Sequence, residues 1–179
     1  CAFEVNWNKD FIAIHEGKPL KNIALTYNNH FSKGELVISK FGLEGNAIYA
    51  LSQKIQDDLL SKESTIVYLD LKPTMTVAQI KIKYKKSRRS KPTYILKKDL
   101  NLDATAIAIL KQFTTKDTFS SIDLLSKIIK AVPINIKSSG ELDEAISSLG
   151  GISLNEVDKN LQYKKIPNSY AIGEMLDWY

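Results

Sequence analysis

The sequence has little cysteine and no long apolar segment. Its only cysteine is Cys1, which excludes an intrachain disulfide. No apolar run approaches the length of about 18 residues that a transmembrane helix needs. The first residues, CAFEVNWNKDF, lack the basic and apolar regions of a secretory signal. We therefore expect a cytoplasmic protein that does not associate with a membrane.

The motifs of several enzyme classes are also missing. His15 and His30 have no second histidine or cysteine at ligand spacing, so we interpret them as turn or strand-end residues and predict no metal site. No G-x-S-x-G nucleophile motif occurs, and no catalytic residue can be named. Neither G-x-G-x-x-G nor G-x-x-x-x-G-K-[ST] is present, so the usual glycine-rich cradles for nucleotide phosphates are absent from the sequence.

What is present suits a globular domain with an uneven charge. Hydrophobic residues fill 44% of the 179 positions, enough for the core of one domain, or of one domain with a small appendix. The net charge is +5, but nine of the 25 basic residues and no acidic residue lie between Lys81 and Lys98. This segment is either a footprint for nucleic acid or an anionic membrane, or a solvated surface. Only Tyr84 and Tyr94 offer stacking, so we prefer the solvated surface.

Residues 1–75 are predicted to be rich in strands, with one helix. The stretches AFEVNW, FIAIH, NIALTY and GELVIS alternate apolar and polar residues, as half-buried strands do, and STIVYLDLKP is a further strand. Between them, apolar residues recur at spacings of three and four, at Ile48, Leu51, Ile55 and Leu59. This spacing predicts an amphipathic helix from Asn46 to about Lys62.

Residues 76–149 are predicted to be mostly helical. Thr76 is a candidate cap for a helix, although the alternation of Ile80, Ile82 and Tyr84 also suits a strand. Asp103 precedes the helical stretch ATAIAILKQF. The following helix, IDLLSKIIK, is expected to open with Ser120 and Asp123 in a capping-box-like arrangement.

The chain is then expected to return to strands. PINIK, at 133–137, is a predicted strand, and Ser138 with Glu141 is a capping box for a helix over LDEAISSL. Gly150 and Gly151 would end that helix, and short strands follow over 150–179. The order predicts an α+β fold: an antiparallel, β-barrel-like sheet with an inserted, mostly helical subdomain, and discontinuous segments that return to the β part.

Three glycine-containing segments are candidate ligand contacts. Gly42-Leu43-Glu44-Gly45 directly precedes the 46–62 helix and is either a tight strand-to-helix turn or a backbone that approaches a ligand. We interpret Gly150-Gly151 as the C-cap of the preceding helix, and a close approach to a ligand is the alternative. The sharpest signal is SYAIGEMLD, a predicted strand that ends in Gly173-Glu174 with Asp177 three residues later. This arrangement suits a dinucleotide. The glycine leaves room for the ligand to pass, and the carboxylate accepts a hydrogen bond from a ribose or ribityl hydroxyl.

Several of these stretches together resemble one family. CAFEVNW, GKPLKNIAL, GELVISKFGLEGNAIYALS, LGGISLNEVD and IPNSYAIGEMLDW resemble, in order and spacing, the BaiN and aminoacetone-oxidase-like FAD-dependent bacterial flavoproteins, closest to a branch with a GEMLDW motif. They span the first third and the last sixth of the chain. The resemblance implies an N-terminal FAD-binding region with a glycine fingerprint, then an inserted substrate domain, then a return to the flavin domain.

The resemblance implies roles for particular residues. This chain corresponds to the insert and the first return strands, so FAD is expected in a full-length parent oxidoreductase and not on this chain alone; NAD(P)H is a possible further cofactor. Gly150, Gly151, Gly173, Glu174 and Asp177 match the segments that approach FAD. Many flavoproteins have Gly-Asp where this chain has Gly-Glu, so the contacting carboxylate is either Glu174 or Asp177.

The resemblance also implies partners. The loop with Gly42, Glu44 and Gly45 would face the boundary between insert and flavin domain. The expected partners are the chain's own FAD-binding domain, an unknown small-molecule substrate and, through the return strands, a second copy. The alternative hypothesis is a free-standing basic module that binds nucleic acid through residues 81–98.

Overall fold

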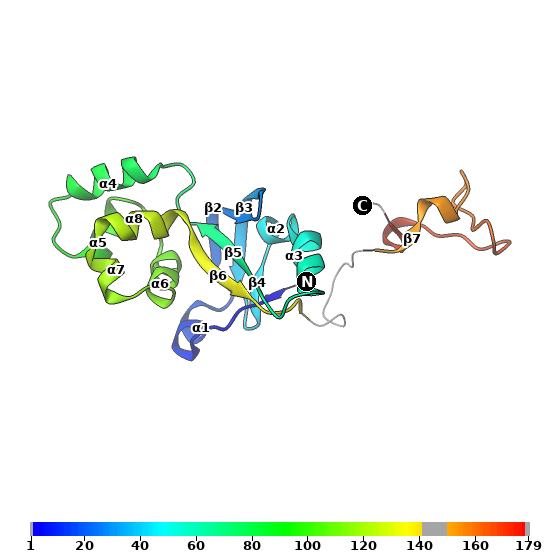
Figure 1. Ribbon diagram of the computed structural model, residues 1–179, viewed down its shortest axis with the longest axis horizontal. Helices are drawn as coiled ribbons and strands as arrows, with labels where there is room; N and C mark the ends of the chain where they lie inside the picture. Colours follow the sequence, from blue (N-terminus) through cyan, green and yellow to red (C-terminus); the bar gives the residue numbers. More distant parts are fainter. Residues whose placement is uncertain (1, 141–149, 178–179) are drawn as a thin grey trace. The chain divides into compact units, whose positions relative to one another are not determined.

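The computed structural model describes residues 2–140 and 150–177 (Figure 1). The chain divides after Ser139 into two compact units, which are described separately here. The first, Ala2–Ser139, contains a sheet and the helices α1 to α8; the second begins at Gly140. No helix in the described ranges combines the length and the apolar character needed to cross a membrane.

The first unit is built on a six-stranded antiparallel sheet. Its strands lie in the order β1-β4-β3-β2-β5-β6, and every neighbouring pair is antiparallel. The strands are β1 (Phe3–Glu4), β2 (Pro19–Tyr27), β3 (His30–Ile38), β4 (Gly42–Glu44), β5 (Thr65–Asp70) and β6 (Val132–Ile136).

The two edges of this sheet are joined. The Glu4 N–H donates to the Ser138 carbonyl at 2.8 Å, and the Lys137 N–H donates to the Glu4 carbonyl at 3.2 Å. The chain that follows β6 therefore hydrogen-bonds to β1 at the opposite edge, which curls the sheet into a barrel. This confirms the predicted antiparallel, barrel-like sheet, and it leaves no open edge at this point.

Alternating side chains separate the inside of the barrel from its outside. Leu25, Leu69 and Val132 face one another across β2, β5 and β6, and all three are fully buried. One residue along, Thr26 and Tyr68 form the adjacent row, and Tyr68 is exposed. This is the period of two expected for a sheet with one buried face.

One predicted strand is a helix. FIAIH forms most of α1 (Lys9–His15), not a strand. Asn8 caps this helix, because its side-chain oxygen accepts the Asp10 N–H at 2.9 Å. Phe11 and His15, four residues apart, are the buried positions, and their rings stack with centroids 4.9 Å apart. The sequence FIAIH alternates as a strand would, but the cap at Asn8 and the four-residue spacing of its buried rings favour the helix.

The helix predicted over 46–62 is present but broken. It consists of α2 (Asn46–Tyr49) and α3 (Ser52–Leu59). The break lies at Leu51, whose N–H bonds to the Ile48 carbonyl in a tight turn while its side chain is buried. Ile48 and Ile55 are fully buried as predicted.

Between β5 and β6 the chain forms five helices, which confirms the predicted helical subdomain. They are α4 (Val77–Lys85), α5 (Pro92–Lys98), α6 (Ala104–Gln112), α7 (Lys116–Ser120) and α8 (Ile122–Lys130). The choice left open after Thr76 is resolved as a helix. Thr76 and Gln79 form a capping box, with Thr76 Oγ1 accepting the Gln79 N–H and Gln79 Oε1 accepting the Thr76 N–H.

The start of α8 differs by one residue from the prediction. Ser121, not Ser120, is the N-cap, and its hydroxyl oxygen accepts the Leu124 N–H. Ser120 belongs to the end of α7, where its hydroxyl donates to the Lys116 carbonyl at 3.0 Å. The prediction assigned Ser120 to the start of α8, but Ser120 ends the short helix α7 that directly precedes it.

The helices and the barrel share one hydrophobic core. Buried residues of α4, α6 and α8 belong to the same cluster as the inward side chains of the strands. Lys130, at the end of α8, forms an ion pair with Asp70 at 2.5 Å and donates to the Lys72 carbonyl at 2.9 Å. The helical subdomain is thus held to the end of β5 by packing and by a partly buried charge.

In the second unit, the described residues 150–177 form short elements. It contains β7 (Ile152–Ser153), β8 (Leu176–Asp177), and the short 3₁₀ turns η2 (Leu154–Glu156) and η3 (Gly173–Met175). The helix predicted over LDEAISSL, with its box at Glu141, lies outside the described residues.

Candidate functional site

The second unit brings two of the predicted segments together. β7, directly after Gly150-Gly151, pairs in parallel with β8, which lies within the GEMLD segment. Ile152 faces Leu176, and Ser153 faces Asp177. Two segments that are separated by about twenty residues of sequence therefore form one small, two-stranded sheet.

Gly151 is the point of closest approach between these segments. A Cβ at Gly151 would lie 2.8 Å from the Met175 carbonyl oxygen, 2.9 Å from the Leu176 carbonyl carbon and 3.0 Å from the Asp177 nitrogen. Those distances are below van der Waals contact, so the pairing requires a residue without a side chain. Its φ of +148° also favours glycine.

Gly150 and Gly173 are in a different situation. Both have positive φ, +88° and +57°, and nothing lies within 4 Å of the place where a Cβ would be. Their backbone conformation favours glycine, and the space beside them is open. Glu174, in η3, is exposed, and Asp177 is half-buried at the end of β8. All five predicted cofactor-binding residues thus lie in this unit.

The predicted strand SYAI is not formed. Residues 169–172 contain only an isolated bridge between Tyr170 and Gln162, and the regular strand begins after the glycine, at Leu176. Ala171 is buried, and its N–H donates to the Leu161 carbonyl. The alternation of buried and exposed residues in SYAI therefore arises in a loop and not in a strand. The left-handed conformation of Gly173 then turns the chain into η3.

The second unit has a very small core. Only Val157, Ala171 and Leu176 of its described residues form a buried cluster, with three half-buried neighbours. An ion pair between Glu156 and Lys165, at 2.8 Å, closes its outer loop and holds the pKa of the Glu156 carboxyl below its usual value. Large apolar side chains are exposed around it: Leu154, Ile166, Tyr170, Ile172 and Met175.

The loop Gly42–Gly45, which the resemblance places at the boundary with a flavin domain, lies in the first unit. Packing inside this unit explains why positions 42 and 45 are glycine. A Cβ at Gly42 would lie 1.7 Å from the Phe3 carbonyl oxygen, because β4 pairs with β1 there. Gly45 has a φ of +114°, and a Cβ would lie 2.6 Å from the Glu35 carbonyl oxygen. Glu44 faces Val37 across β3 and β4. The tight strand-to-helix turn, one of the two interpretations of this loop, accounts for both glycines.

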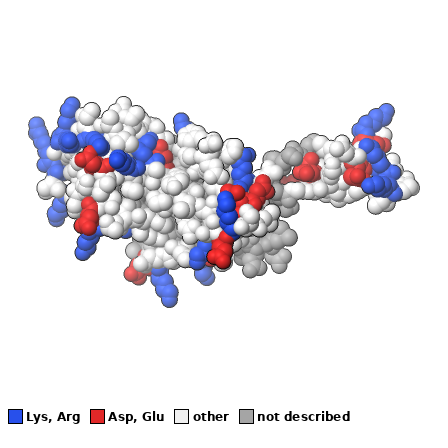
Figure 2. All heavy atoms as spheres, in the orientation of Figure 1, with Lys and Arg blue, Asp and Glu red and all other residues white. Residues whose placement is uncertain are grey.

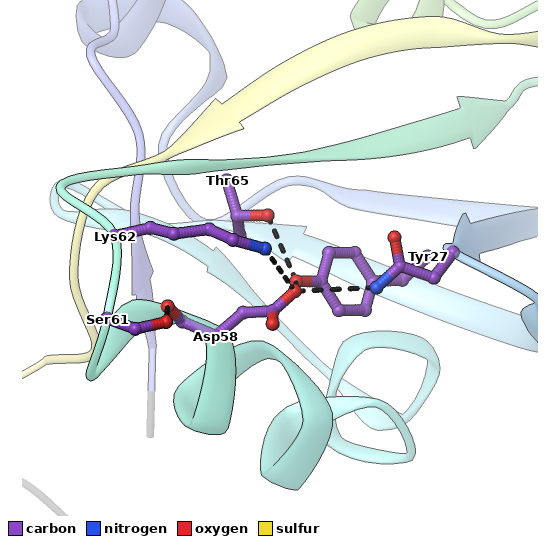
Figure 3. Close-up of polar contacts among 6 residues, drawn as sticks. Tyr27, Asp58, Ser61, Lys62 and Thr65 are labelled. Atoms are coloured by element: carbon purple, nitrogen blue, oxygen red, sulfur yellow. Dashed lines mark hydrogen bonds and ion pairs between the residues drawn. The ribbon is translucent and has the colours of Figure 1, made fainter.

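A polar cluster at the end of β2 has no counterpart in the sequence predictions. The hydroxyl of Tyr27, whose side chain is buried, donates to Asp58 of α3 and lies 3.0 Å from Thr65 Oγ1 (Figure 3). Lys62 forms an ion pair with Asp58 at 3.1 Å. Asn28 is a further donor to Asp58.

The electrostatics of this cluster fit a structural role. Burial raises the pKa of the Tyr27 hydroxyl, and its hydrogen bond to Asp58 adds to the rise. The hydrogen bonds from Tyr27 and Lys62 lower the pKa of the Asp58 carboxyl. A protonated tyrosine and an ionised carboxylate are thereby both stabilised, which fastens α3 to the strands and supplies no base for catalysis.

His15 is also held in a structural contact. Its Nδ1 lies 3.0 Å from Thr105 Oγ1 of α6, and its ring is buried, so it is a helix-end residue rather than the predicted turn or strand end. Among the described residues, no group of three histidine, cysteine, aspartate or glutamate side chains is placed to hold a metal ion. A shallow cavity of about 390 Å³ opens between α1 and α6 beside His15, lined by Phe11, Ile14 and Gln112.

One comparison with known proteins bears on this arrangement. A protein-family model described as "HI0933-like protein barrel and H2TH domain" matches residues 1–147. The chain belongs to the HI0933-like family. This confirms the resemblance to the BaiN and aminoacetone-oxidase-like flavoproteins, and it identifies the HI0933-like chain as a flavoprotein-related domain. The match covers the barrel and the helices α4 to α8 and ends before Gly150.

Proposed function

We propose that this chain is the insert, or substrate, domain of an FAD-dependent oxidoreductase. In this proposal residues 1–75 supply the β-rich part, residues 76–149 the mostly helical subdomain, and residues 150–179 the return toward an FAD-binding domain. The barrel and helices would form walls of the substrate pocket over the flavin. The second unit would carry the segments that approach the cofactor.

The observation that carries the proposal is the pairing of β7 with β8. It joins Gly150-Gly151 to the GEMLD segment, the two places at which the family resemblance puts contacts to FAD. Nothing in the sequence spacing alone requires these segments to meet. Their meeting is what a single cofactor-facing surface needs, and the absence of a side chain at Gly151 permits the close approach.

The residues present fit a flavin dinucleotide. Gly150 and Gly173 have no side chain, and the space beside each is open, so a bulky ligand can approach their backbone. Glu174 and Asp177 are carboxylates within a few residues of Gly173 and suit acceptors for ribityl or ribose hydroxyls. When bound, FAD supplies the redox chemistry; these residues would bind and orient it, and the insert would exclude water.

The exposed apolar side chains of the second unit support a docking role. The buried cluster formed by the described residues of this unit has three members, and small domains need more buried area or a covalent staple to be stable alone. Leu154, Ile172 and Met175 are exposed beside it and offer apolar surface to cover. A flavin domain from the same polypeptide is the partner that the family context favours.

The test compares the complete open reading frame with the chain itself. We expect the product of the complete frame to carry stoichiometric FAD, released on denaturation and quantified by absorbance, and the 179-residue chain to carry none. A stop codon directly after Tyr179 with no flavin-binding sequence before Cys1 would remove the proposal. So would stoichiometric flavin on the isolated chain.

A matched pair of variants in the complete protein tests the site itself. Gly173 and Gly17 both have positive φ and open space beside them, but Gly17 lies in the first unit between α1 and β2. Gly173→Leu is expected to lower the FAD content strongly, whereas Gly17→Leu leaves it unchanged. Equal FAD content in the two variants would contradict the assignment of Gly173.

A further inference from the structure

The helical subdomain carries a concentrated basic surface. We define it as the basic residues of α4, of the linker 86–91 and of α5. Between Lys81 and Lys98 there are nine and no acidic residue. Eight of them are exposed, and Lys81 is half-buried. Figure 2 shows blue Lys and Arg side chains over the helical part of the first unit, at the left of the view, with few red acidic side chains among them.

Few of these charges are neutralised within the protein. Lys81 forms an ion pair with Asp123 of α8, and Arg89 forms one with Asp99 at 3.4 Å. Asp99 also accepts the Ser87 hydroxyl at 2.6 Å. The other seven basic residues form no ion pair with a carboxylate in the described ranges: Lys83, Lys85, Lys86, Arg88, Lys91, Lys97 and Lys98.

The few acidic groups nearby lie in an excess of positive charge. The pKa of the Asp123 carboxyl is lowered first by its hydrogen bond and charge contact with Lys81, and further by Lys85 and Lys127. One carboxylate thus faces three lysines. The potential of this region is therefore positive even after its internal ion pairs are counted.

The fold does not need these charges where they are. Most large apolar residues of α4 and α5 face the core: Ile80, Ile95 and Leu96 are buried and Tyr84 is half-buried, whereas Ile82 is 54% exposed. The basic residues lie on the solvent-facing side of both helices. Lys83 of α4 and Lys86, its C-cap, are three residues apart and share one side of the helix end. Tyr94 is 55% exposed in α5 and presents an aromatic ring within the basic surface.

We propose that this basic surface binds the phosphate backbone of single-stranded nucleic acid, with little dependence on base sequence. A phosphodiester chain supplies many closely spaced negative charges, which match a surface of seven cations without an internal ion pair. The exposed Tyr94 ring adds a face on which an unpaired base can stack. A membrane-binding helix instead inserts a continuous apolar face. Ile80 of α4 and Leu96 of α5 are buried in the core, and the exposed Ile82 is a single side chain, not such a face.

This inference does not depend on the flavoprotein assignment. The basic surface lies in the first unit, whereas the proposed flavin contacts lie in the second. Loss of RNA binding would leave the FAD content unaffected, and the absence of FAD would leave RNA binding unaffected, so the two proposals fail separately.

The experiment measures binding of a fluorescent, single-stranded RNA 20-mer to the 179-residue chain by anisotropy, across a series of salt concentrations. With about four phosphate contacts, the plot of log K against log salt should have a slope of about −3. Tyr94→Ala should weaken binding at least about fivefold through lost stacking. A second RNA of unrelated sequence should bind within about threefold of the first, because backbone contacts carry no sequence information.

A charge-matched control separates the surface from the net charge. Lys83→Glu, Lys86→Glu and Arg88→Glu together should lower affinity at least about tenfold, because each removes a phosphate contact and adds repulsion. Lys9→Glu, Lys40→Glu and Lys54→Glu change the net charge by the same amount at exposed positions elsewhere, and should retain most of the affinity. Far-UV circular dichroism checks the fold; if the reversal variant is unfolded, the glutamine versions of the same three positions decide.

Three results would overturn the proposal. The first is no binding of RNA at low salt. The second is equal loss of affinity in the two triple variants, which would attribute binding to net charge alone. The third is tight binding to phosphatidylserine-containing vesicles, lost in the Lys83, Lys86 and Arg88 variant, together with no binding to RNA; this would identify an anionic membrane as the partner.

Discussion

Gly151 lies so close to Met175 that a Cβ at Gly151 would stand 2.8 Å from the Met175 carbonyl oxygen. The contact joins two segments that the sequence presents far apart, and it sets the register in which Ile152 faces Leu176. The backbone of the GEMLD segment thus pairs with the strand that follows Gly151, and the pairing leaves no room for a side chain at that position.

Gly151→Ala is expected to disrupt this pairing, whereas Gly150→Ala is not. Both positions have positive φ, so both variants carry backbone strain, but only the Cβ at position 151 meets other atoms. Overpacking of this kind costs typically about 1–3 kcal/mol. Hydrogen exchange of the amides of 152–177 measures it: protection should fall in Gly151→Ala and persist in Gly150→Ala. Equal protection in the two variants would show that the close approach does not hold the unit.

Tyr27→Phe is expected to destabilise the barrel. The substitution removes the hydroxyl that bonds Asp58 and Thr65 and leaves their polar groups without this partner at a partly buried site. The expected loss is about 1–2 kcal/mol in the free energy of unfolding, from urea titration. Tyr94→Phe, at an exposed ring, is the control and should stay within about 0.5 kcal/mol of the parent chain. A Tyr27→Phe variant as stable as its control would show that the cluster does not fasten α3.

His15 is expected to make the first unit less stable as the pH falls below about 6.5, the ordinary pKa of histidine. Burial, and secondly the charge of Lys18, lower the pKa of His15 in the folded state, while Asp103 opposes them. The unfolded chain then binds the proton more readily, so stability is fully present above the unfolded pKa and is lost as the pH drops through it.

The measurement compares the free energy of unfolding at about pH 7.5 and about pH 5.5 in the parent chain and in His15→Gln. The glutamine retains a polar group for Thr105 but does not titrate, so its stability should change less over this interval. His30→Gln, at the exposed first residue of β3, should keep the pH dependence of the parent. The same pH dependence in all three proteins would exclude His15 as the source.

Much of the helical part was predictable because its signals are local. Thr76 and Asp103 each cap the helix that follows them, and a cap together with helical spacing is contained in a few residues. The same kind of signal existed for α1 in Asn8, but FIAIH also alternates. Phe11 and His15 fit both periods, so the pattern could not distinguish a helix from a strand.

The remaining features depend on contacts between distant residues. Tyr27 and Asp58 are 31 positions apart, and no spacing rule indicates that they meet. Closure of the barrel depends on Glu4 and Ser138, and the GEMLD segment forms a strand only at Leu176, where β7 supplies a partner. The family resemblance named Gly151 and Gly173, but only the fold distinguishes them: one glycine is enclosed by backbone and the other faces open space.

The most direct test of the central claim is hydrogen exchange of the complete protein with and without FAD. We expect bound FAD to protect amides at 150–151 and 173–177, and to leave those at 42–45, which serve barrel packing, unchanged. Protection confined to other segments, with exchange at 150–151 and 173–177 unaffected by the flavin, would contradict the assignment of the second unit as the cofactor-facing part of the chain.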